Sequence, residues 1–184
     1  KILGNKVKIR GALIQIGKEK INRNNWDWKQ IQKNDFFCPD KNKLRKWESY
    51  IKSIRKEGSS VGAVIEINVS GINTGLGEPV FDKVDALLAY GIMSIPAVKG
   101  FEIGAGFKSA ELRGEDNSDQ ILSKGKKTLF KSNNAGGTLG GITSGQDLVI
   151  RFVVKPTSSI LIERDTINVH GKNTKIKTKG RHDP

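Results

Sequence analysis

Segments with the pattern of β-strands outnumber those with the pattern of helices in this chain, and their order limits the folds open to it. β-branched and apolar side chains are frequent in residues 6–16, 60–70, 97–112, 147–155 and 159–169, as is typical of strands. The last two segments follow each other without a helix, whereas a parallel pair needs a crossover of roughly a dozen or more residues. The chain is therefore expected to form an α+β layered domain rather than a doubly wound parallel sheet.

One helix is expected between the first two strands. Apolar residues recur there at spacings of three and four, which is the pattern of one helix face: Leu44, Trp47, Ile51 and Ile54. Asp40 or Asn42 is expected to cap the N-terminus of this helix, and Gly58 is expected to end it.

A second helix is expected to follow the glycine-rich loop of residues 71–79. Pro79 suits a first helical turn, where a missing N–H costs nothing. Apolar residues would lie along one side of this helix: Val80, Val84, Leu87, Leu88 and Ile92. Farther along, residues 113–131 are expected to form a long loop, and residues 171–184 a turn-like tail.

Length and composition exclude several classes of protein. The 184 residues amount to roughly one domain, and the apolar runs are far shorter than the roughly 20 residues of a membrane-spanning helix. No charged-then-apolar secretory leader opens the sequence at Lys1. Cys38 alone cannot form an internal disulfide, and His170 and His182 suggest no cluster of metal ligands. A secreted mini-protein, a membrane span and a zinc module are therefore excluded.

The chain is strongly basic, with 32 Lys and Arg against 19 Asp and Glu and a net charge of +13. Such a charge raises the local concentration of anions, whether nucleic acid, acidic membrane or phosphorylated metabolite. It is equally consistent with a general compositional bias toward lysine. A nucleic-acid-binding domain would interleave arginine with aromatic residues, whereas Trp26, Trp28 and Trp47 all lie early in the chain. Charge alone leaves the ligand open.

Two glycine-rich segments are candidate binding loops. Residues 75–82 precede the second expected helix, where backbone N–H groups can approach an anion, but a tight strand-to-helix turn explains them as well. Residues 132–141 contain four glycines and little side-chain bulk, so that the backbone can come close to a flat ring or a phosphate. A flexible turn is the alternative for this segment.

Two charged segments are candidates as well. Lys155 is followed by Pro156 and by three hydroxyl residues at positions 157–159, which together could hold a phosphate or simply end a strand. Residues 179–184 combine an arginine with an aspartate that could act as a base, although a basic tail is the simpler interpretation.

Taken in order, these segments resemble the chorismate synthases. The matching stretches are FFCPD (36–40), GLGEPVFD (75–82), SIPAVKG (94–100), EIGAGF (102–107), SNNAGGTLGG (132–141), KPTS (155–158) and GRHDP (180–184). Each motif alone is weakly specific, but seven in the family's order are specific. Residues 124–129 look longer and more basic than the corresponding family loop.

The resemblance implies a carbon–oxygen lyase that makes chorismate. Such enzymes eliminate phosphate from 5-enolpyruvylshikimate 3-phosphate in a 1,4 sense, within the shikimate pathway to the aromatic amino acids. They need reduced FMN, and NADPH is a candidate reductant. The implied assembly is a homotetramer in the cytoplasm, with a small-molecule substrate and with neither nucleic acid nor membrane as partner. A non-catalytic flavin- or phosphate-binding module and a basic nucleic-acid-binding domain are the alternatives.

The resemblance also implies the site residues. Contacts with FMN would come from Pro96, Ala97, Gly140, Lys155, Pro156, Thr157, Ser158, Ser159 and Arg181. Arg181 would also contact the substrate, and Asp183 would be the catalytic residue that handles a flavin proton. No metal is implied.

The fold implied by the resemblance is the family's layered sandwich, with antiparallel or mixed sheets inside and helices outside. Residues 1–184 are expected to be a single partial domain, truncated at both ends. The family's two acid–base histidines and most of its substrate-binding arginines would belong to an absent N-terminal half.

Overall fold

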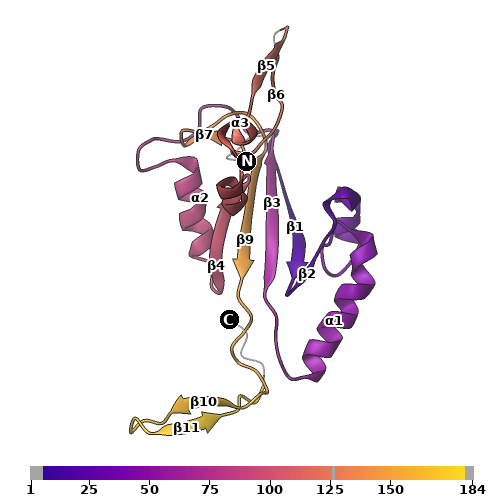
Figure 1. The fold of residues 1–184 in the computed structure, drawn as a ribbon, viewed down its shortest axis with the longest axis vertical. Coiled ribbons are helices and arrows are strands. Elements are labelled where there is room, and N and C mark those ends of the chain that lie inside the picture. Colours follow the sequence, from indigo (N-terminus) through magenta and orange to yellow (C-terminus); the bar gives the residue numbers. More distant parts are fainter. Residues whose placement is uncertain (1–5, 126, 181–184) are drawn as a thin grey trace. The chain divides into compact units, whose positions relative to one another are not determined.

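The computed structural model describes residues 6–125 and 127–180 (Figure 1). These residues fall into two compact units. Of the described residues, 6–12, 65–125 and 127–153 belong to the first unit, and 13–64 and 154–180 to the second. Five strands pair in the order β2-β1-β3-β9-β4. Of these, β1 (Lys8–Ile16), β3 (Ala63–Ser70) and, through its last residue, β9 (Leu148–Val154) place residues in both units.

The second unit is built around α1 (Leu44–Lys56). Its other elements are β2 (Glu19–Lys20), η1 (Arg23–Asn25), η2 (Trp28–Lys33), η3 (Lys41–Lys43), β10 (Arg164–Ile167) and β11 (Asn173–Ile176). Trp47 on the apolar face of α1 is fully buried and packs with Ile16 and Cys38. The periodicity of α1 therefore builds the core of this unit, as the sequence predicts.

The first unit contains the remaining elements. They are α2 (Val84–Met93), β4 (Val98–Ile103), η4 (Gly106–Glu111), α3 (Gly114–Asn117), β5 (Ile121–Lys124), β6 (Lys127–Phe130), β7 (Thr138–Leu139), β8 (Ile142–Thr143) and β9 (Leu148–Val154). Strand β9 alternates buried and half-buried residues, and Leu148, Ile150 and Phe152 are its buried set. The antiparallel pairs β5–β6 and β7–β8, together with the helices, confirm the α+β class.

Helix α2 begins later than the sequence predicts. It starts at Val84, so Pro79 and Val80 lie in the preceding loop and not in its first turn. The backbone N–H and C=O groups of Glu78 and Asp82 bond to each other across this loop, which closes residues 79–81 into a turn. The carbonyl of Asp82 is therefore taken by the N–H of Glu78, whereas in an α-helix it would accept from a residue four positions later in the chain.

Four further expectations were wrong in their boundaries. The strand expected over residues 159–169 is limited to β10 (Arg164–Ile167). The strand expected over residues 97–112 ends at Ile103 and continues as the 3₁₀-helix η4. The long loop expected over residues 113–131 contains α3 and the hairpin β5–β6, which projects from the rest of its unit (Figure 1). The expected tail supplies β11, because Gly171, with φ +75°, lies in a turn that folds it back on β10. Within the described residues, no helix is long and apolar enough to span a bilayer.

Candidate functional site

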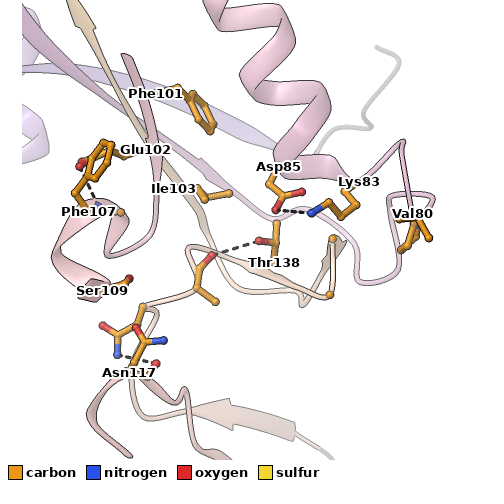
Figure 2. Close-up of a pocket in the computed structure, with 16 residues that line it drawn as sticks. Val80, Lys83, Asp85, Phe101, Glu102, Ile103, Phe107, Ser109, Asn117 and Thr138 are labelled. Carbon is orange, nitrogen blue, oxygen red and sulfur yellow. Dashed lines mark hydrogen bonds and ion pairs between the residues drawn. The ribbon is translucent and has the colours of Figure 1, made fainter. Parts of the chain in front are cut away.

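A broad cavity of about 890 Å³ lies in the first unit. Its lining comes from three stretches of chain, within residues 79–85, 101–117 and 134–141. The first stretch leads into α2, the second runs from β4 into α3, and the third is the glycine-rich segment. Figure 2 shows Phe101, Ile103 and Phe107 on the same stretch of the lining as Glu102, so the cavity offers both apolar and charged contacts.

The glycine loop, residues 132–141, supplies backbone to this cavity. Gly140 has φ +59°, and a Cβ built there would meet nothing within 4 Å. The main chain at this position is thus open to a ligand without any side chain in the way. Next to it, the carbonyl of Gly141 accepts a hydrogen bond of 2.9 Å from the N–H of Val84, the first residue of α2. This bond fixes the loop against the start of the helix.

The charged side chains of the cavity are paired. Lys83 Nζ lies 3.9 Å from an Asp85 carboxylate oxygen, beside the glycine loop (Figure 2). Glu102 accepts 3.1 Å hydrogen bonds from Arg151 Nε and from the N–H of Phe107. Arg151 also pairs with the buried Glu66 at 3.4 Å and donates to the carbonyl of Gly104. The carboxylate of Glu102 is therefore held in one orientation at the cavity wall.

The segment Lys155–Ser159 lies in the second unit and directly follows β9. Ser60 Oγ donates a 2.6 Å hydrogen bond to the carbonyl of Thr157 and so fixes the main chain. Within residues 6–125 and 127–180, the ammonium of Lys155 forms no ion pair, and the hydroxyls of residues 157–159 form no hydrogen bond. A cation and three hydroxyls without partners suit the phosphate of a ligand.

The structure brings only some of the predicted site residues together. Gly140 lines the cavity, whereas Pro96 and Ala97 do not. They lie in the turn after α2, at the end opposite Val84, and ten helical residues span about 15 Å. Ala97 is one of two non-glycine residues with positive φ, at +68°, among the described residues. Arg181 and Asp183 lie outside the described residues.

Sequence reasoning did not single out several residues of the cavity wall. Glu102 and Asn134 lie inside matched motifs but were not assigned a role, and Lys83 lies just after one. The signal in the sequence that could have identified them is a polar side chain placed between glycines and apolar residues. Within the described residues, no group of three or more His, Cys, Asp or Glu is placed to hold a metal ion.

Comparisons with known proteins agree on one family. A family model described as chorismate synthase matches residues 1–184. The chain is 58% identical over 178 residues to a chorismate synthase of Bradyrhizobium sp. (strain BTAi1), covering 97% of this chain and 49% of that protein. It is 57% identical over 182 residues to the one of Pelagibacter ubique, with 99% and 51% covered. A solved crystal structure of chorismate synthase matches with a TM-score of 0.75 at 32% identity, over 82% of this chain and 49% of that one. The chain spans about half the length of the curated relatives it matches.

Proposed function

This chain belongs to the chorismate synthase family, and from that premise we propose that it supplies part of the flavin and substrate site of a chorismate synthase. The proposed reaction breaks the C–O bond to phosphate and a ring C–H bond of 5-enolpyruvylshikimate 3-phosphate. Its products are chorismate and inorganic phosphate. The proposed cofactor is reduced FMN, with NADPH as a candidate reductant, and the proposed assembly is a cytoplasmic homotetramer.

This proposal rests on the polar side chains of the segment Lys155–Ser159, which lack partners among the described residues. A lysine without an ion pair and three hydroxyls without hydrogen bonds, all among the described residues, make donors available on a main chain that Ser60 holds in place. These donors fit the phosphate and ribityl oxygens of FMN. The open backbone at Gly140 fits a flat ring, because no Cβ intervenes. The residues present therefore fit the cofactor.

Each group has a defined part in the proposal. Lys155 holds the charge of the cofactor phosphate, and Thr157 and Ser158 donate to its oxygens. Gly140 allows close approach of the ring. When bound, reduced FMN supplies electron density that helps the substrate phosphate leave. Arg181 would lie between cofactor and substrate, and Asp183 would accept a proton as an ionised carboxylate.

The test is a pair of lysine variants of the whole protein that carries this chain. Lys155→Ala should weaken FMN binding about ten- to hundredfold, since a charge-assisted hydrogen bond is lost. Lys172→Ala is the matched control, because Lys172 is an exposed lysine of the same unit. Unchanged FMN affinity in Lys155→Ala would refute the assignment.

Phosphate release under anaerobic conditions separates the rival functions. The wild-type protein should release phosphate from the substrate only when reduced FMN is present. FMN binding without phosphate release would favour the non-catalytic module. Tight binding of nucleic acid without FMN binding would favour the basic domain.

A further inference from the structure

The glycine loop needs an anchor outside itself. Residues 135–137 are Ala-Gly-Gly, and such residues bury little apolar surface and lose much conformational freedom on folding. Yet Asn134, Ala135 and Gly140 all line the cavity. The shape of the cavity wall therefore depends on whatever fixes the backbone of residues 132–137.

Asp119 contacts this backbone with both carboxylate oxygens. Oδ1 accepts hydrogen bonds from Ser132 Oγ at 2.5 Å and from the N–H of Asn134 at 2.7 Å. Oδ2 accepts a bond of 2.9 Å from the N–H of Ala135. A carboxylate that accepts several hydrogen bonds holds its partners more strongly than a neutral acceptor does.

Neutral bonds hold the same loop from its other sides. Asn134 Nδ2 donates to the carbonyls of Asp116 and Asn117 at 3.0 and 3.3 Å, and its own carbonyl accepts from the N–H of Ala105 at 2.6 Å. Toward β9, Gln146 Nε2 donates to the carbonyl of Ser132 at 2.7 Å. Asp119 thus provides the charged anchor on the side where the hairpin β5–β6 leaves the loop.

We propose that Asp119 is a positioning residue, which fixes the backbone of the glycine loop and thereby shapes the cavity beside Gly140. Asp119 itself is not part of the cavity lining, so it acts through Asn134 and Ala135. Its importance for the cofactor rests on the proposed function, whereas its effect on the loop does not. Nothing in the sequence motifs assigns a role to this residue.

Amide hydrogen exchange tests the anchor directly, since two of its three partners are backbone N–H groups. In Asp119→Ala, the amides of Asn134 and Ala135 should exchange about ten- to hundredfold faster. Asp119→Asn keeps the shape but places an NH₂ group against one donor, so at least one of the two amides should exchange faster. The amide of Glu57, which donates to the carbonyl of Ser53 at the end of α1 in the second unit, should not change.

Two further variants serve as controls for the hydrogen-exchange experiment. Asp116→Asn alters an exposed carboxyl of the same segment, and it should leave exchange at both amides unchanged. Ser132→Ala removes one of the three bonds and should produce a smaller increase; it also serves if Asp119→Ala does not fold. Unchanged exchange at Asn134 and Ala135 in Asp119→Asn would overturn the proposal.

FMN titration of the whole protein then tests the link to the cofactor. Asp119→Asn should weaken FMN binding by about tenfold, and Asp116→Asn should not. Faster exchange with unchanged FMN affinity would overturn the positioning role for the cofactor. Failure of the wild-type protein to bind FMN would refute the proposed function, and the exchange result would still decide whether Asp119 anchors the loop.

Discussion

Asp40 is a fully buried carboxylate that stabilises the chain ahead of α1. It accepts hydrogen bonds from the N–H of Asn22 at 2.9 Å, from Asn25 Nδ2 at 3.3 Å and from the N–H of Asn42 at 3.0 Å. Asp40→Ala would remove three hydrogen bonds to a carboxylate, which should lower the free energy of unfolding by about 3 kcal/mol. Urea denaturation measures this change. Asp35→Ala, at an exposed position nearby, should change stability by less than about 0.5 kcal/mol.

A second residue-scale prediction concerns acid stability. Partial burial raises the pKa of Asp119, but the hydrogen bonds from Ser132, Ala135 and Asn134 outweigh it and hold the pKa below its ordinary value of 3.8. A depressed pKa means that the carboxylate stabilises the folded chain at higher pH, and that this contribution is lost as the pH falls through the folded-state value.

The measurement is the difference in unfolding free energy between the wild type and Asp119→Asn. This difference should be constant near neutral pH and should shrink as the pH falls below 3.8, the ordinary pKa of an aspartate. A difference that grows toward acid pH would contradict the sign of the effect.

At the scale of elements, the sequence predicts best where one face of an element is buried. Helix α1 and strand β9 match their expected ranges closely, because Trp47 and Phe152 mark periodic buried positions. The sequence predicts worst where exposed residues form structure. All four residues of β5 are exposed. The sequence therefore shows no periodic pattern of buried apolar positions from which the hairpin β5–β6 could be predicted.

The candidate site follows the same rule. Gly140 is found from its motif, because close backbone approach needs a residue without a side chain. Glu102 and Asp119 are found only in three dimensions, because their partners lie elsewhere in the chain. Arg151 is 49 residues from Glu102, and Ser132 is 13 residues from Asp119. No local spacing encodes such pairs.

A prediction at the element scale contrasts two glycines of the first unit. Gly136 has φ +69°, and a Cβ there would overlap the backbone of Gly104. Gly136→Ala should therefore lower the free energy of unfolding by about 3 kcal/mol, through left-handed backbone strain and overpacking. Gly91, within α2, has nothing within 4 Å of a built Cβ, so that Gly91→Ala should raise it by about 0.5–1 kcal/mol. Equal effects of the two substitutions, measured by urea denaturation, would contradict this account.

At the scale of the whole molecule, much apolar surface faces solvent. Val169 is 95% exposed, Phe81 89%, Phe107 82% and Tyr90 80%. None of the residues of α2 is buried, although the helix is mostly apolar. Exposed apolar area of this kind is typical of surfaces that contact further protein. The chain spans about half the length of the curated relatives it matches.

The last prediction is that these 184 residues by themselves do not turn over substrate. In the proposed mechanism, the two acid–base histidines of the family and most of its substrate-binding arginines do not lie in the seven motifs that this chain shares with the family. One general acid or base contributes about two to four decades of rate, so losing two, together with substrate positioning, should reduce phosphate release at least about ten-thousandfold. The assay is anaerobic phosphate release with reduced FMN, comparing this chain with the whole protein at equal concentration.

The control is an FMN titration of the same chain, because weak FMN binding would show that the segment Lys155–Ser159 is folded. Turnover within about tenfold of the whole protein would show that groups in this chain carry the acid–base chemistry, because such a ratio is smaller than the contribution of even one such group.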